Sequence, residues 1–176
     1  MLLACAPLVA PGTARALIDV ESAGNPYAIG VVAGSLVRQP RNLSEALATA
    51  RALEAAGWNF SVGLGQVNKK NFAQYGLTLE TAFDPCSNLQ AMQAILGECF
   101  ERASARSGEQ AALRQAFSCY YSGNFQTGFD HGYVQRVIAA YRVGHRNVGR
   151  TPIDSSETAT SQQSPSKRTP SLRTNP

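Results

Sequence analysis

The spacing of apolar residues predicts helices through most of the chain. Over residues 13–23 apolar side chains fall three or four positions apart, as expected for one buried helix face. Thr13 is expected to be the N-cap of this helix. A second helix is predicted over residues 43–57, with Ser44 as its cap and Gly57 at its end.

The second half of the chain continues this helical pattern. Helices are expected within residues 84–108, 109–123 and 130–144. A Gly-rich turn over residues 61–68 leads into a further short helix, and the one suggestion of strand is a short ribbon over residues 30–38. The expected fold class is therefore α, a compact helical domain.

Length and composition indicate one domain with an appendage. A chain of 176 residues with 44% hydrophobic residues can bury one sizeable core. Residues 149–176 are rich in Ser, Thr and Pro and contain no aromatic residue, so they cannot offset the entropy cost of ordering. We expect a domain over residues 1–148 and a disordered basic tail over 149–176, with no transmembrane segment.

The net charge of +4 falls mostly within residues 146–176. The rest of the chain shows no basic helix face interleaved with aromatic residues, so nucleic-acid binding by the folded domain is not expected. Near the start, Leu-Leu-Ala-Cys around Cys5 imitates a lipoprotein cleavage box, but no basic or long apolar stretch precedes it. No signal peptide is visible, so either there was none or the native start lies upstream of Met1.

Four segments in a fixed order resemble the lysozyme-like lytic transglycosylases. They are "ESAGNPYA" (21–28), "SVGLGQVN" (61–68), "CYYSGN" (119–124) and "YVQRV" (133–137). The stretch between the first two resembles the VirB1-like branch that belongs to type IV secretion and conjugation systems. The resemblance covers about residues 5–145 and implies an α+β lysozyme-like fold, mostly helical.

The resemblance implies that Glu21 is the catalytic residue. Cleaving a β-1,4 bond between N-acetylmuramic acid (MurNAc) and N-acetylglucosamine (GlcNAc) needs a proton for the leaving oxygen, and therefore a carboxylic acid kept protonated near neutral pH. In the family one glutamate acts first as the acid and then as the base on the muramic C6 hydroxyl. This gives a 1,6-anhydromuramoyl product without water, without a second carboxylate and without a cofactor.

The resemblance also implies a set of substrate-binding residues. They are Ser22, Gln66, Tyr120, Gly123, Asn124 and Tyr133. Tyr133 matches the tyrosine whose hydroxyl reaches the catalytic carboxylate. The chain departs from the family at Gly65, where a Met is usual, and at Tyr121, where an Asn is usual. Trp58 either stacks on a sugar or packs in the core.

The chain also contains four cysteines and two histidines, which could support other chemistry. Cys86 and Cys99 are expected about 20 Å apart on one helix, too far for a disulfide. This leaves Cys5–Cys86 with Cys99–Cys119, Cys5–Cys99 with Cys86–Cys119, or four reduced thiols. His131 and His145 lack metal-ligand spacing and are expected to be solvated loop residues, so no metal site is predicted.

The sequence therefore predicts a periplasmic lytic transglycosylase. Its partners would be the glycan strands of peptidoglycan and components of a type IV secretion system. Two alternatives remain open: a hydrolytic goose-type lysozyme, and an assembly factor that binds glycan or pilus components without catalysis.

Overall fold

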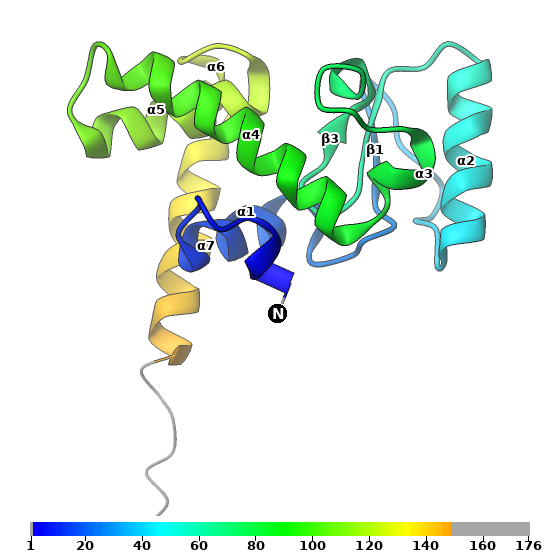
Figure 1. Ribbon diagram of the computed structural model, residues 1–176, viewed down its shortest axis with the longest axis horizontal. Coiled ribbons are helices and arrows are strands. Elements are labelled where there is room, and N and C mark those ends of the chain that lie inside the picture. The colour runs from blue at the N-terminus through cyan, green and yellow to red at the C-terminus, as the bar shows by residue number, and fades with distance from the viewer. Residues whose placement is uncertain (1, 149–176) are drawn as a thin grey trace, which may run out of the picture.

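The computed structural model describes residues 2–148, which form helices around one small antiparallel sheet (Figure 1). This confirms the expected mostly helical fold. The helices are η1 (Leu2–Cys5), α1 (Pro11–Ser22), α2 (Leu43–Ala55), η2 (Lys69–Asn71), α3 (Leu79–Ala82), α4 (Pro85–Ser104), α5 (Glu109–Ser122), α6 (Thr127–Asp130) and α7 (Tyr133–Val148). None of these helices is long and apolar enough to cross a bilayer. The tail expected over residues 149–176 lies outside the described residues.

Two predicted helix caps are wrong. Helix α1 begins at Pro11, which suits a first helical position because its missing N–H has no partner there, and Thr13 lies buried inside the helix. Helix α2 is capped by Asn42, whose Oδ1 accepts a hydrogen bond from the Glu45 N–H at 2.9 Å. Ser44 is therefore a helical residue and not the cap.

The sheet pairs segments that are far apart in sequence. It contains β1 (Ile29–Val31), β2 (Phe60–Val62) and β3 (Val67–Asn68) in the order β1-β2-β3. Strand β1 pairs antiparallel with β2, so the local ribbon predicted over 30–38 is wrong beyond its first two residues. The free edge of β1 is covered by Gln39, whose amide donates to the Ile29 carbonyl and accepts from its N–H.

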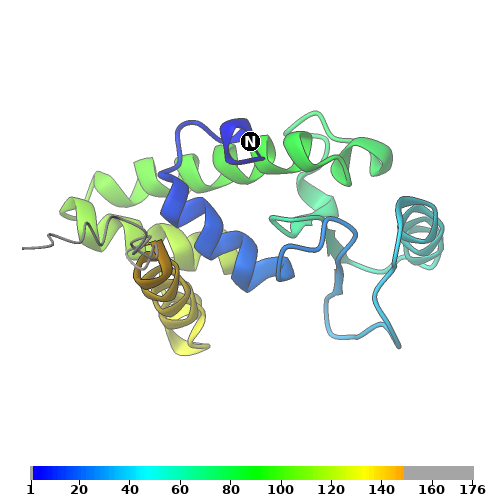
Figure 2. The ribbon, with the colours of Figure 1, turned by 90° about the horizontal axis from the view of Figure 1, so that it is seen from below.

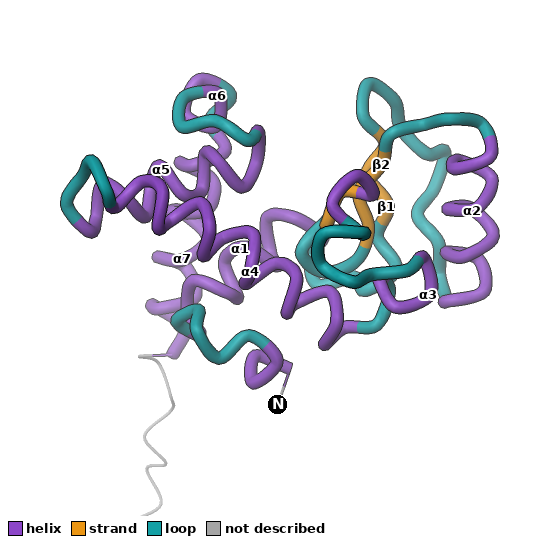
Figure 3. Tube along the Cα trace, turned by 45° about the horizontal axis from the view of Figure 1, so that its top comes forward, coloured by secondary structure: helices purple, strands orange, loops and turns teal. Residues whose placement is uncertain are grey.

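Two apolar clusters divide the molecule. One cluster, here called the helical side, joins η1, α1, α4, α5 and α7 around Leu17, Leu89, Met92, Phe117 and Tyr133. The other, the ribbon side, joins the sheet with α2, η2, α3 and Ala91 of α4 around Ile29, Phe60, Val62 and Phe72. Figure 2 shows α1 beside α4, with α2 at the far end of the molecule. In Figure 3 the strands gather next to α2 and α3.

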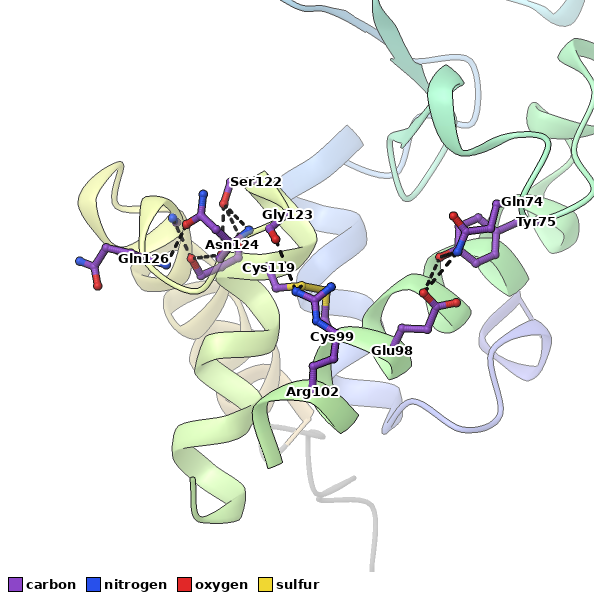
Figure 4. The surroundings of a disulfide bond; sticks show 12 residues. Gln74, Tyr75, Glu98, Cys99, Arg102, Cys119, Ser122, Gly123, Asn124 and Gln126 are labelled. Carbon is purple, nitrogen blue, oxygen red and sulfur yellow. Dashed lines mark hydrogen bonds between the residues drawn. A yellow bond between two sulfur atoms is a disulfide. The ribbon is translucent and has the colours of Figure 1, made fainter. Parts of the chain in front are cut away.

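Both disulfides lie on the helical side. Cys5–Cys86 joins η1 to the start of α4. Cys99–Cys119 joins α4 to α5, as Figure 4 shows. Their Cα atoms are 5.1 and 5.8 Å apart, within the usual range for a disulfide. The structure thus confirms one of the two pairings that the sequence left open and not the reduced alternative.

Trp58 follows the end of α2 and does not pack in the core. Its side chain is 47% exposed. The core-packing alternative for this residue is therefore wrong.

Candidate active site

Glu21 lies in the last turn of α1, where the chain leaves the helix. Ala23 adopts the left-handed conformation (φ 51°), and its N–H donates to the Asp19 carbonyl at 3.2 Å. Gly24 continues the turn with φ 78°. The helix therefore ends immediately after Glu21 and holds the carboxyl group at its C-terminal end, where the helix dipole disfavours negative charge.

The carboxyl group of Glu21 is strongly perturbed by its surroundings. Burial raises its pKa from 4.5 to about 7, while the hydrogen bond from Tyr133 and the positive charge of Arg136 act in the opposite direction. At neutral pH a large fraction of Glu21 is therefore protonated. This is the state that a general acid needs.

Tyr133, the first residue of α7, contacts this carboxyl group directly. Its hydroxyl donates a hydrogen bond to Glu21 Oε1. The ring is 2% exposed, and the Arg136 guanidinium lies over it at 5.7 Å from the centroid. Burial raises the pKa of Tyr133 far above its usual value, so the phenol remains a donor at every physiological pH.

Ser22 connects the end of α1 to the turn between β2 and β3. Its Oγ lies 3.1 Å from the Ile18 carbonyl oxygen and 2.9 Å from the Leu64 carbonyl oxygen, and can donate to either. Among the described contacts of the Ser22 side chain, none is a hydrogen bond to Glu21. It holds the turn against the helix that carries the carboxyl group.

That turn carries Gln66, which the sequence assigned to the substrate groove. Gln66 has a positive φ of 48°, and its Nε2 donates to the carbonyls of Ala28 (3.1 Å) and Gly63 (3.0 Å). Its Oε1 faces Gly30, where an added Cβ would lie only 2.7 Å away. The Gln66 amide nitrogen thus hydrogen-bonds to the backbone, and its amide oxygen is the group that can bind a ligand.

Gly65, which stands where the family usually has Met, is tightly enclosed. A Cβ at this position would lie 2.9 Å from Met92 Cβ and 3.1 Å from the Tyr120 hydroxyl. The Tyr120 hydroxyl donates to the Gly65 carbonyl. The space next to Gly65 is therefore filled from α4 and α5, and a larger residue would displace Tyr120.

These residues border a cleft of about 520 Å³. Glu21, Ile95, Tyr120, Tyr121 and His131 line it from the helices. Gly30, Val31, Val32, Ser61, Gln66, Val67, Asn68 and Asn71 line it from the sheet and η2. Among the lining residues that the structure describes, Glu21 is the only carboxylate. The lining otherwise combines amides, hydroxyls and apolar groups, which suits an uncharged polar polymer such as a glycan.

Four of the six predicted binding residues, Ser22, Gly123, Asn124 and Tyr133, are not part of this cleft lining. Tyr133 contacts Glu21, and Ser22 contacts the turn at Leu64, whereas Gly123 and Asn124 lie in the turn after α5. Gly123 ends α5 with φ 79°, and Asn124 follows it. The Asn124 Oδ1 accepts from the N–H groups of Gln126 (2.9 Å) and Thr127 (2.8 Å). Figure 4 labels Asn124 and Gln126 near the Cys99–Cys119 bridge. The amide of Asn124 therefore shapes the turn into α6, and the structure does not bring it together with Glu21.

Conversely, the cleft includes residues that the sequence did not assign to substrate binding. Tyr121 and His131 both line it, together with Asn68 and Asn71 of the ribbon side. His131 is exposed, as the sequence analysis expected, but its position in the cleft depends on how α5, α6 and α7 pack together. The one feature of the sequence that could have indicated this part of the cleft is Tyr121, an aromatic residue directly after Tyr120 where the family usually has Asn.

The residues described show no metal centre. No group of three or more His, Cys, Asp or Glu side chains within residues 2–148 is placed to hold a metal ion.

Comparison with known families decides what kind of enzyme this cleft belongs to. The Transglycosylase SLT domain matches residues 3–164. The chain belongs to the SLT transglycosylase family. Its helical fold is thus that of an SLT domain, and the transglycosylase family expected from the sequence is confirmed.

The relatives of this SLT chain include proteins named virB1. It is 52% identical over 156 residues to the type IV secretion system protein virB1 of Brucella suis, which covers 85% of the chain and 66% of the relative. Protein virB1 of Agrobacterium fabrum is 33% identical over 159 residues, or 90% of the chain and 65% of the relative. The chain thus spans about two thirds of the length of these relatives. No solved structure gives a significant match.

Proposed function

We propose that this SLT domain cleaves the MurNAc–GlcNAc β-1,4 bond of peptidoglycan and leaves a 1,6-anhydromuramoyl end. The observation that carries the proposal is a single carboxyl group in the described cleft, Glu21, with a pKa raised to about 7. Hydrolytic glycosidases of the common type need a second carboxylate, either to activate water or to act as nucleophile. A lone acid suits a reaction in which the substrate supplies its own nucleophile.

Glu21 acts twice in this mechanism. Protonated Glu21 donates its proton to the glycosidic oxygen as the bond from that oxygen to the muramic C1 breaks. The resulting carboxylate then accepts the proton of the C6 hydroxyl, whose oxygen bonds to C1 and closes the anhydro ring. Glu21 ends protonated and no water is consumed. A pKa near neutrality serves both steps, because neither the acid nor the carboxylate is strongly disfavoured.

The neighbouring residues have supporting roles in this proposal. Tyr133 holds the carboxyl group by its hydrogen bond to Oε1, and Ser22 fixes the turn beside it. Tyr120 and Gln66 line the path of the glycan, with Tyr120 also bonded to the Gly65 carbonyl. Each of these contacts keeps a cleft group in a defined position before substrate binds, which is the usual basis of a fast chemical step.

We further propose that the enzyme works in the periplasm and opens the wall for a type IV secretion or conjugation apparatus. The names of its relatives support this role. Two disulfides support an oxidising compartment, because cytosolic proteins keep their thiols reduced.

Mass spectrometry of digested wall sacculi tests the reaction. The proposal expects anhydro ends, one water lighter than reducing ends, from the wild type and none from Glu21→Gln. Reducing ends would instead identify a goose-type lysozyme. Retained glycan binding without any cleavage would identify an assembly factor.

A further inference from the structure

Tyr121 and His131 form a linked pair in the wall of the cleft. Tyr121 lies in the last turn of α5, and His131 follows α6. The Tyr121 hydroxyl is 3.2 Å from His131 Nδ1, and the two rings meet edge to face with centroids 5.9 Å apart. Both side chains line the same cleft as Glu21.

This pair is fixed to the catalytic centre by a second contact. The Tyr121 ring stacks on the Tyr133 ring, with centroids 4.6 Å apart and planes inclined by 18°. Tyr133 in turn donates to Glu21. The hydroxyl of Tyr121 therefore has a defined position relative to the carboxyl group at which the glycosidic bond would be cleaved.

The backbone of His131 is equally constrained. Its N–H donates to the Thr127 carbonyl at 3.0 Å, and its carbonyl accepts from Arg136 Nη1 at 3.0 Å. Gly132 then turns the chain into α7 with φ 68°. The backbone that carries the imidazole is thus held from both α6 and α7, while the side chain is exposed to solvent.

The hydrogen bond to Tyr121 determines what His131 can offer a ligand. The donor in this hydrogen bond depends on the tautomer of His131, and in the neutral tautomer that accepts at Nδ1 the Tyr121 O–H is the donor. The ring hydrogen then resides on Nε2, because a neutral imidazole carries one N–H. No hydrogen bond to Nε2 is found among the described residues. The pair therefore offers a neutral N–H donor in the cleft.

We propose that Tyr121 and His131 recognise the carbonyl oxygen of an N-acetyl group on the glycan, so that the enzyme discriminates against N-deacetylated sugars. This inference rests on the proposed function, which places glycan in the cleft. An N-acetyl carbonyl is a neutral acceptor that matches a neutral N–H donor. The ammonium left by deacetylation has no acceptor, and it would be repelled by the nearby positive charge of Arg136.

Kinetics on paired substrates test this assignment. Soluble wall glycan is prepared fully N-acetylated and, from the same batch, partly N-deacetylated. His131→Ala should lower kcat/KM on the acetylated glycan by about tenfold, the effect of one lost hydrogen bond. The loss should appear in KM with kcat nearly unchanged, and the preference for acetylated glycan should shrink by the same factor.

Two conservative variants refine the test. Tyr121→Phe keeps the ring stacked on Tyr133 but removes the hydroxyl that orients His131, so it should reduce the preference by less than His131→Ala. His131→Gln retains an N–H donor and should recover part of the preference. An unchanged preference in His131→Ala, or an equal loss of kcat on both substrates, would overturn the proposal.

A second tyrosine–histidine pair provides the matched control. Tyr141 and His145 lie in α7 with ring centroids 4.4 Å apart and pack near Gly12, outside the cleft lining. Tyr141→Phe and His145→Ala should leave the preference for acetylated glycan unchanged. A similar loss in these controls would show that the effect is general and would contradict the assignment.

Binding measurements separate this inference from the proposed function. Glu21→Gln protein is titrated with both glycans by calorimetry, with and without His131→Ala. If product analysis fails to find anhydro ends but His131→Ala still removes the binding preference, the reaction is wrong and the recognition site stands. If anhydro ends form but binding shows no preference, the recognition site is wrong.

Discussion

The two sides of the cleft contribute different things to the site. The helical side carries the acid, Glu21, together with Tyr133 and Arg136, which both lower the pKa of Glu21. The ribbon side contributes backbone edges and the amides of Gln66 and Asn68. The chemistry therefore depends on the side that holds both disulfides, whereas much of the substrate path depends on a side without a crosslink among residues 2–148.

Asn88 of α4 connects the two sides by hydrogen bonds, although no disulfide does so among residues 2–148. It is fully buried, and its Nδ2 donates to the carbonyls of Val62 (2.9 Å) and Ala82 (2.8 Å). Its Oδ1 accepts from the Gly65 N–H at 2.7 Å. One helix of the crosslinked side thus satisfies three backbone groups of the other side, which fixes the turn that carries Gln66.

The largest expected effect is a loss of activity when Glu21, the acid on the helical side, is replaced. Glu21→Gln keeps the shape of the side chain but has no proton to transfer, so activity on wall glycan should fall by about 10⁴-fold. Glycan binding should be largely retained. Release of muropeptides is the measurement, and activity within a few-fold of wild type would contradict the assignment of Glu21.

Removing the crosslinks should destabilise the protein to a degree set by the loop that each one closes. Replacing Cys5 and Cys86 by Ser opens a separation of 81 residues, and replacing Cys99 and Cys119 opens one of 20. Loop-closure entropy predicts losses of about 4.5 and about 3 kcal/mol in the free energy of unfolding. Urea titration of both double variants measures this, and the reverse order would refute a purely entropic account.

Stability should depend on pH through the same glutamate. The pKa of Glu21 is raised to about 7 in the folded protein, so between about pH 4.5 and pH 7 the unfolded chain loses this proton first. Its contribution to stability is present at acid pH and is lost as the pH rises through the folded pKa, by about 3 kcal/mol in all. Glu21→Gln should lack this loss.

The comparison of unfolding free energies isolates this one group. Wild type and Glu21→Gln share every other carboxylate, including Glu45 and Asp84, whose lowered pKa values act in the opposite direction in both proteins. The difference in unfolding free energy between the two proteins should therefore change only between about pH 4.5 and about pH 7. Parallel curves would mean that Glu21 is ionised like a surface glutamate.

The sequence predicted the helices of both sides better than the sheet. Helices are marked by local spacing, and even where the caps at Thr13 and Ser44 were wrong, the helices themselves were correct within a few residues. Strand β1 instead pairs with β2, about thirty residues later, and no local pattern specifies that partner. Long-range pairing is set by packing of the whole core.

The same distinction applies to the site. The position of Glu21 before a helix-ending turn could be predicted, because Gly24 and Pro26 end the helix locally. The Tyr121–His131 pair could not, because it forms only when α5, α6 and α7 pack together. Asn124 was expected near the glycan for its amide, but that amide is used in the turn before α6.

The smallest expected effect is a shift of the pH–rate profile when the hydrogen bond from Tyr133 to Glu21 is removed. This bond lowers the pKa of Glu21 against the larger effect of burial. Tyr133→Phe removes it and keeps the ring, so the pKa of Glu21 should rise above about 7 and the alkaline limb of the pH–rate profile should move to higher pH, by up to about one unit. Tyr120→Phe is the matched control, because its hydroxyl donates to the Gly65 carbonyl and not to Glu21. A limb that moves to lower pH in Tyr133→Phe, or that moves equally in both variants, would show that Tyr133 does not act on the acid through this bond.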